Sequence, residues 1–295
     1  MCPCCKSPDF SVIGCPKLDA KAKSIVKCDY KILQCLICKY YYVFPKISFS
    51  RKEWEVLYDN KYFEKQTKWH IKKRKKERIN RLNKLQYYSD IKIERFLDVG
   101  CGEGFVLLQA NQMGWEAYGL DIVDNRVGDA KLIKNFKNCD LIDANYPDNY
   151  FDCIYLDSIL EHITNPKEYI KEISRILKKV GVIYIGVPNE DSLLNTVKKL
   201  RNMLLNRSYY SPKIKPFITP YHVGGFNRFS IKYLLIDENF SICKLSNFAT
   251  RAVFLLTRFP SKQFLLYLGL TIISSIAFII RWESYLGVYA RKINN

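Results

Sequence analysis

The glycine-rich segment FLDVGCGEGF contains the side chains with the clearest chemical meaning. Gly100, Gly102 and Gly104 alternate with other residues shortly after Asp98. Where a strand turns into a helix, glycines let the backbone turn tightly and approach a ligand closely. A G-x-G-x-x-G dinucleotide loop seats a pyrophosphate, which a neighbouring carboxylate would repel. Asp98 instead favours a cationic ligand group, such as the amino group of S-adenosylmethionine.

A second acidic residue, Asp121, follows 23 residues after Asp98, at the end of the apolar run EAYGL. A carboxylate at that point can accept hydrogen bonds from both ribose hydroxyls of a nucleoside. The same geometry would serve NAD, and a lone Asp at a strand end can also cap a helix. Together with the glycine loop, Asp121 favours a nucleoside-containing cofactor.

Two C-x-x-C pairs near the start of the chain, about thirty residues apart, predict a zinc ribbon. The expected ligands are Cys2, Cys5, Cys35 and Cys38. Alternates or inert thiols are Cys4, Cys15 and Cys28, and the pairs are followed by Lys6 and Lys39, where glycine is commoner. A redox C-x-x-C is the competing interpretation, but it would place a single pair beside a βαβ unit.

The elements that must position these residues follow from the hydrophobic pattern. From about residue 92, short apolar runs alternate with amphipathic stretches, which predicts an α/β, Rossmann-like parallel sheet with helices on both faces. Expected strands are IERFLDVG, EAYGLD, FDCIYLD and GVIYIGVP, and a helix opened by Asn165-Pro166 should bury one stripe. That stripe comprises Tyr169, Ile170, Ile173, Ile176 and Leu177. The predicted domains are a zinc-ribbon-like module (1–45), a basic helical connection (46–91) and the Rossmann-like domain (92–295).

The motifs FLDVGCGEG, YGLD, FDCIYLDSILEHITNP and SRILKKVGVIYIGVPN, between about residues 95 and 190, resemble those of class I S-adenosylmethionine-dependent methyltransferases. The nearest branch resembles ubiquinone-type O-methyltransferases and methyltransferases of surface-glycan gene clusters, many of which carry an N-terminal ribbon. One departure is Val180-Gly181, where the family usually has Gly-Gly. The resemblance implies cofactor contacts by Asp98, Gly100, Cys101, Gly102, Gly104, Asp121, Ile122, Asp143, Ala144, Asp157 and Ser158.

The expected methyl acceptor depends on the residues that come after the fourth strand. That place holds residues 157–162, DSILEH, without the Asn/Asp-Pro-Pro-Tyr/Phe element of amine-modifying relatives or a Pro-Cys nucleophile. An oxygen or carbon acceptor on a small molecule is therefore favoured, and a hydroxyl would need a base. The candidates are His222 in YHVGGFNRFS and His162 in the Glu161-His162 pair, because both segments resemble substrate-facing loops of the family. Either histidine could instead hold its loop in place.

The charge of the chain predicts an anionic partner. With 47 basic and 29 acidic residues the net charge is +18, which fits a polyanion, an anionic membrane surface or a phosphate-bearing substrate. Residues 65–84 alone contain ten basic residues and one acidic one. They predict a solvated linker helix. The alternative is an RNA-binding surface. The N-terminus MCPCCKSPDF lacks a secretory signal pattern, so we expect a cytoplasmic protein.

The apolar stretch QFLLYLGLTIISSIAFII, 18 uncharged residues between Lys262 and Arg281, would span about 27 Å as a helix against a hydrocarbon core of ~30 Å. The following ESYLGVYARK resembles the family's final strand, which a single crossing would leave on the wrong side of the bilayer. We therefore expect an apolar helical hairpin, inserted at about 252–281, that packs on the domain or dips into one leaflet. Arg251, Arg258, Lys262 and Arg281 would then meet anionic headgroups. An ordinary buried or dimer-forming helix is the alternative.

These observations combine into one expectation. The chain should transfer a methyl group from S-adenosylmethionine to a hydroxyl of a sugar, glycan or lipid-linked intermediate, with a structural zinc ion in the ribbon. The alternatives are an RNA methyltransferase, which the basic segment would suit, and a catalytically idle scaffold. A scaffold has no physical need for both the glycine loop and Asp121.

Overall fold

The computed structural model describes residues 1–15, 30–47, 50, 68–205, 214, 221–249 and 261–293. The chain divides into two compact units. The first unit comprises Met1–Lys46, Val187–Ile231 and Leu245–Gly287. The second unit comprises Ile47–Gly186, Lys232–Lys244 and Val288–Asn295. Among the residues named above, Cys28, Arg251 and Arg258 lie outside the described ranges.

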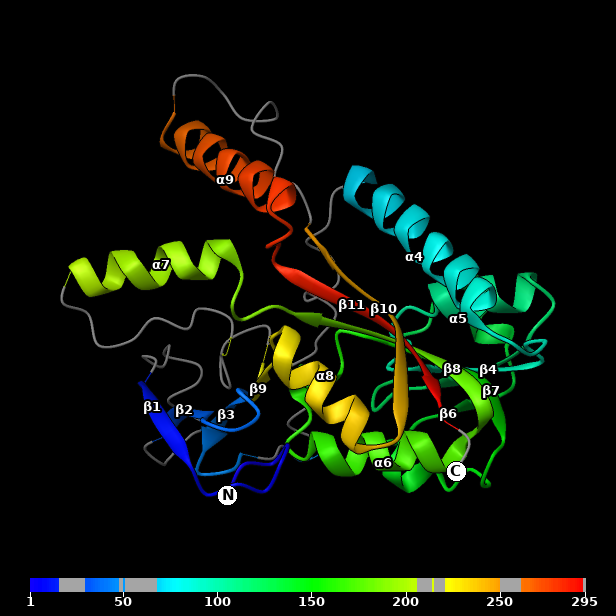
Figure 1. The fold of residues 1–295 in the computed structure, drawn as a ribbon. Helices are drawn as coiled ribbons and strands as arrows, with labels where there is room; N and C mark the ends of the chain where they lie inside the picture. Colours follow the sequence, from blue (N-terminus) through cyan, green and yellow to red (C-terminus); the bar gives the residue numbers. More distant parts are fainter. Residues whose placement is uncertain are drawn as a thin grey trace. The chain divides into compact units, whose positions relative to one another are not determined.

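A seven-stranded sheet has the strand order β10-β11-β8-β7-β4-β5-β6 (Figure 1). Its strands are β4 (Arg95–Val99), β5 (Glu116–Leu120), β6 (Phe136–Lys137), β7 (Phe151–Asp157), β8 (Leu177–Pro188), β10 (Phe240–Phe248) and β11 (Tyr285–Lys292). The five strands from β6 to β8 run parallel, and Asp98 in β4 lies opposite Gly119 in β5 and Tyr155 in β7. The predicted α/β, Rossmann-like sheet is confirmed. Its parallel strands bring their carboxyl ends, and the polar residues that follow them, to one edge.

Helices cover both faces of the sheet (Figure 1). On one face lie α4 (Lys68–Tyr88) and α5 (Phe105–Gln112), and on the other lies α6 (Pro166–Ile176). Side chains of α4 and α5 share one core with alternate residues of the strands, because successive strand residues point to opposite faces. That core includes Leu82, Leu85, Val106, Leu107, Phe96, Cys153, Tyr155, Val182 and Tyr184.

Helix α6 begins at Pro166. Proline suits the first position of a helix because a backbone N–H there would have no partner within the helix. It buries the predicted stripe of Tyr169, Ile170, Ile173 and Ile176. Leu177 is buried too, but it begins β8 instead of continuing the helix. The short elements η1 (Gly128–Leu132), η2 (Ile142–Ala144), η3 (Leu160–His162) and α8 (Arg228–Asp237) complete the connections.

In the first unit, a small antiparallel sheet has the order β1-β2-β3-β9. Its strands are β1 (Phe10–Gly14), β2 (Lys31–Cys35), β3 (Tyr41–Phe44) and β9 (Gly224–Gly225). The Tyr40 and Phe226 rings lie 4.7 Å apart, and a Cβ atom on Gly224 would fall 1.8 Å from the Tyr40 hydroxyl oxygen. The cysteine-bearing strands therefore share one packed sheet with a segment about 180 residues later in the chain.

The apolar stretch forms one continuous helix, α9 (Lys262–Ile279), and packs against α7 (Leu193–Leu204) in the same unit. The following ESYLGVYARK supplies β11, which is the last strand along the chain and lies between β10 and β8 in the sheet. Within the described ranges, no helix combines the length and apolar character needed to span a membrane.

Candidate functional site

The glycine loop forms a tight turn between β4 and α5. Gly100, Gly102 and Gly104 have φ angles of 69°, 51° and 78°, a left-handed conformation that side chains with a Cβ disfavour. The N–H groups of Gly100 and Cys101 both donate to the Leu120 carbonyl, at 2.7 and 3.0 Å. These bonds hold the loop against the end of β5, where Asp121 follows.

Asp121 connects the two strand ends through its carboxylate. Its Oδ2 accepts a 2.8 Å hydrogen bond from the Gly102 N–H, and its Oδ1 accepts one of 3.3 Å from Val123. Burial raises the pKa of the Asp121 carboxyl, while these backbone donors act in the opposite direction. Ile122 follows Asp121 directly and is half-buried.

Asp98 is buried, with 3% of its surface exposed. Burial raises the pKa of its carboxyl to about 8, and the negative charges of Asp121 and Asp157 add to the effect, whereas the Arg78 guanidinium opposes it. Three carboxyl groups therefore gather at the ends of β5, β4 and β7. Ionising Asp98 beside these carboxyl groups in a low dielectric is costly unless a cation approaches, so its surroundings suit a ligand with a positive charge.

Helix α4 supplies two arginines to this cluster. Arg81 Nη1 lies 2.6 Å from Asp157 Oδ2, and Arg78 Nε lies 3.9 Å from the same oxygen. The Tyr155 hydroxyl donates to that carboxylate at 3.4 Å. Arg81 is held further by its position over the Tyr184 ring, 5.2 Å from the centroid.

These arginines were not predicted from the sequence, where residues 65–84 have the pattern of a solvated basic segment. A signal was present in Leu82 and Leu85, which stand three residues apart and are fully buried. This apolar face turns the neighbouring Arg78 and Arg81 toward the sheet. The end of α4 thereby forms part of the candidate site.

The remaining predicted cofactor contacts lie after the strand ends of the same unit. Ser158 follows Asp157 with φ 65°, and its N–H donates to the Gly186 carbonyl at 2.8 Å. Asp143 is exposed and Ala144 is buried, both in η2. Burial raises the pKa of the Cys101 thiol, which makes it a poor nucleophile. The contacts of these residues with a cofactor stay predictions.

The two candidate histidines belong to different units. His162 ends η3 in the second unit, is half-buried and donates its backbone N–H to the Ile159 carbonyl at 2.9 Å. Glu161 beside it is almost fully buried. His222 is buried in the first unit, two residues before β9 begins. Their role as general bases stays a prediction.

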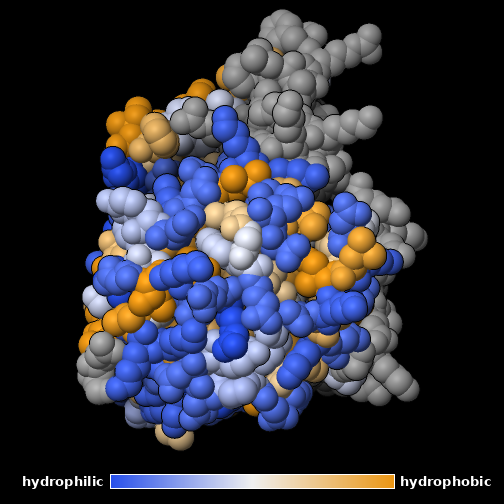
Figure 2. Space-filling view, turned by 90° about the vertical axis from the view of Figure 1, so that its right-hand side faces the viewer, coloured by the Kyte–Doolittle hydropathy of each residue, from blue (hydrophilic) through white to orange (hydrophobic). Residues whose placement is uncertain are grey.

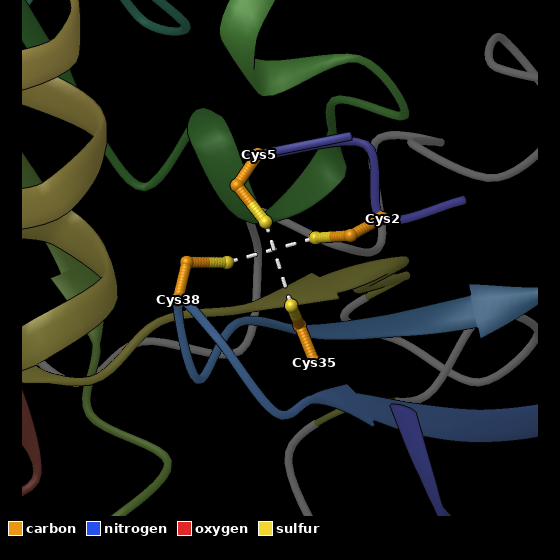
Figure 3. Close-up of side chains that lie close together, drawn as sticks. All are labelled: Cys2, Cys5, Cys35 and Cys38. Carbon is orange, nitrogen blue, oxygen red and sulfur yellow. Dashed lines mark hydrogen bonds between the residues drawn. The ribbon is translucent and has the colours of Figure 1, made fainter. Parts of the chain in front are cut away.

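The four predicted zinc ligands come together in the first unit (Figure 3). Cys2 and Cys38 have their sulfur atoms 3.6 Å apart, those of Cys5 and Cys35 are 3.4 Å apart, and all four lie within 4.8 Å of one another. A tetrahedral site with metal–sulfur bonds of about 2.3 Å has sulfur–sulfur edges of about 3.8 Å. The donor set and its spacing therefore fit zinc. Among the alternates, Cys4 is buried outside this group and Cys15 is exposed.

Both cysteine turns have the same backbone form. Lys6 and Lys39 have φ angles of 62° and 59°, and their N–H groups donate to the carbonyls of Cys2 and Cys35, at 2.8 and 3.1 Å. This left-handed position explains why glycine is commoner there. The two lysines adopt it without changing the turn.

Comparison with known proteins identifies the family. The profile of the methyltransferase domain family matches residues 68–242, more than half of the chain. The chain belongs to this family, as the resemblance predicted, and its sheet is that of a Rossmann-like class I methyltransferase.

Relatives match shorter stretches. The chain is 31% identical over 115 residues to the mitochondrial ubiquinone biosynthesis O-methyltransferase of Dictyostelium discoideum, covering 33% of this chain and 36% of that protein. It is 26% identical over 112 residues to the ubiquinone biosynthesis O-methyltransferase of Rickettsia bellii, covering 35% and 45%. The chain thus matches less than half of the length of these curated relatives.

Solved structures share the fold. A phosphoethanolamine N-methyltransferase 2 of Haemonchus contortus, in complex with S-adenosyl-L-methionine, has a TM-score of 0.53 at 18% identity, covering 86% of this chain and 62% of that chain. A Haloferax volcanii methyltransferase in complex with the Trm112 activator has a TM-score of 0.51 at 16% identity, covering 77% and 96%. At these identities the likeness concerns the fold alone.

Proposed function

We propose that the chain is an S-adenosylmethionine-dependent methyltransferase whose cofactor lies over the glycine loop. The observation that carries this proposal is the buried Asp98, whose raised pKa reflects burial and two neighbouring carboxyl groups. The cationic amino group of the cofactor would lower the cost of ionising it. Asp121 would accept hydrogen bonds from the ribose, since each carboxylate oxygen can accept more than one. Arg78 and Arg81 are charge partners for the cofactor's carboxylate.

S-adenosylmethionine would supply an electrophilic methyl group on its sulfonium. The task of the chain is to orient the acceptor in line with that methyl group and, for a hydroxyl, to hold a base beside it. We propose a hydroxyl of a sugar, glycan or lipid-linked intermediate as the acceptor, with His222 or His162 as the base. Support comes from residues 157–162, where the amine-modifying motif is missing.

RNA is the second candidate acceptor, because ten basic residues lie between positions 65 and 84. Two of them, Arg78 and Arg81, form ion pairs with Asp157 inside the domain instead of pointing into solvent, where RNA phosphates would lie. This arrangement lowers the charge available to phosphates and favours the small-molecule acceptor.

We also propose that Cys2, Cys5, Cys35 and Cys38 hold a structural zinc ion, as their sulfur spacing supports. A zinc ion closed by four thiolates leaves no position for substrate and acts by stabilising the local fold. We further propose that the protein works in the cytoplasm.

Transfer of a labelled methyl group from S-adenosylmethionine to panels of glycan, lipid-linked and RNA acceptors tests the activity. Incorporation into a hydroxyl-bearing acceptor, lost in His222→Ala or His162→Ala with cofactor binding intact, supports the proposal. Salt-sensitive incorporation into RNA alone would favour the second candidate. Cofactor binding without transfer to any of the panels would contradict the proposed acceptor class.

A further inference from the structure

Helices α7 and α9 of the first unit pack against each other and leave rows of apolar side chains exposed. On α7, Val197, Leu200 and Leu204 recur at spacings of three and four residues, and Leu204 is 79% exposed. At 100° per residue, these positions share one face of the helix. Helix α7 therefore has an apolar stripe that the described residues of its unit leave uncovered.

Helix α9 has a matching row. Its exposed members are Leu265, Ile272, Ile276 and Ile279, and Ile279 is 77% exposed. Their positions fall within about 60° on the helical circumference. Ala277, on the other side of the helix, is buried. Phe278, also exposed, lies outside this row. The row is therefore one exposed apolar face of α9, and we call it and the α7 stripe together the α7–α9 surface.

Scattered exposed apolar residues are ordinary on a protein, whereas contiguous rows mark interaction sites. Figure 2, which views the molecule from the right-hand side of Figure 1, shows the ordinary case: the described residues there are mostly hydrophilic, with hydrophobic ones scattered among them. The α7–α9 surface differs, because seven of its exposed positions are Val, Leu or Ile on two packed helices.

Charge indicates which partner would cover the surface. Neither α7 nor α9 contains an Asp or Glu. Lys199 and Arg201 flank the α7 stripe on the helical circumference, and both are exposed, as is Arg281 just after α9. An apolar face bordered by cations is the pattern of helices that lie in the interface of an anionic bilayer.

We propose that the α7–α9 surface binds an anionic lipid bilayer, with the apolar rows in the acyl boundary and the cations at the headgroups. A second copy of the chain fits less well. A two-fold interface through this surface would bring the cations of both copies into one patch without an acidic residue from either helix, and like charges repel. The proposal does not depend on which acceptor is methylated.

Co-sedimentation of the zinc-loaded full chain with vesicles tests the proposal. Vesicles of phosphatidylcholine alone are compared with vesicles that also contain phosphatidylglycerol. We expect binding to the anionic vesicles. The pair Leu200→Glu and Ile276→Glu should weaken it on the order of tenfold or more, since two apolar side chains that would enter the bilayer are replaced by charged ones. Lys199→Gln with Arg201→Gln should lower binding to the anionic vesicles and reduce its salt dependence.

The matched control is the pair Leu132→Glu and Ile236→Glu, which changes two apolar residues of the second unit that are at least as exposed as Leu200 and Ile276. It should bind vesicles like the unchanged protein. The proposal fails if the unchanged protein ignores anionic vesicles, or if both pairs behave alike. It also fails if the unchanged protein is a dimer that does not bind vesicles and the pair Leu200→Glu and Ile276→Glu, but not the control pair, makes it a monomer. A second copy would then cover the surface. S-adenosylmethionine binding, measured on every variant, reports separately on the proposed function.

Discussion

Cofactor binding should tighten as pH rises toward neutrality, because Asp98 must ionise to meet a cationic amino group. Burial raises the pKa of this carboxyl to about 8 in the ligand-free protein. With that pKa, the ionised fraction is about 1% at pH 6 and about 9% at pH 7. The dissociation constant of S-adenosylmethionine should therefore fall about ninefold between these values if the bound Asp98 stays ionised.

The free energy of unfolding of the ligand-free protein should fall as pH rises, whereas cofactor affinity increases. A carboxyl whose folded pKa is raised binds its proton more tightly when folded, so its contribution is complete below the unfolded value of about 3.8. That contribution is lost progressively as pH rises to about 8, on the order of 1 kcal/mol per pH unit. The cofactor should offset this loss, which makes its thermal stabilisation larger at pH 7 than at pH 6.

Calorimetric titration at constant ionic strength, over the range from about pH 6 to pH 7, measures the effect. Asp98→Asn is the control, since its amide keeps the shape of the side chain but cannot ionise. It should bind weakly and show little pH dependence. A wild-type dissociation constant that does not change with pH, or an equal slope in Asp98→Asn, would refute the assignment of the amino group to Asp98.

Three further predictions concern the turns and the ribbon. Gly104→Ala should destabilise the protein by about 1–3 kcal/mol and weaken cofactor binding, because its Cβ would lie 2.6 Å from that of Ala130. Gly114→Ala, also left-handed but with nothing within 4 Å, should cost less, and equal thermal shifts would contradict the argument. Val180→Gly should raise the free energy of unfolding in urea by about 1 kcal/mol, because a β-branched residue there has φ 55°; no gain would mean that the strain is absorbed elsewhere. Cys35→Ser should abolish zinc measured by atomic absorption, whereas Cys15→Ser, at an exposed thiol, should retain it.

The parts of the fold that the sequence predicts correctly rest on local spacing. The parallel sheet follows from short apolar runs, and the α6 stripe follows from helical periodicity, so neither requires knowledge of tertiary contacts. The glycine turn and the cysteine pairs are found for the same reason, since Asp98 with its glycines and each C-x-x-C pair occupy a few consecutive residues.

The parts that the sequence does not predict depend on contacts between distant segments. Arg81 meets Asp157 across 76 residues, and only the burial of Leu82 and Leu85 makes the basic helix face inward. The Asn227 side chain donates to the Lys39 carbonyl, 188 residues away, and so ties the ribbon to the segment after β9. The departure at Val180-Gly181 is visible in the sequence, but only the backbone shows that Val180 itself takes the left-handed conformation. No local pattern specifies such pairings.

We propose that the glycine loop, Asp98 and Asp121 form a site for S-adenosylmethionine instead of a dinucleotide. This proposal can be tested by calorimetric titration of the purified protein with S-adenosylmethionine, S-adenosylhomocysteine and NAD. We expect the first two to bind at a single site, Asp98→Ala to lose this binding, and NAD to give no binding. Binding of NAD without S-adenosylmethionine, or no binding of any of the three, would contradict it.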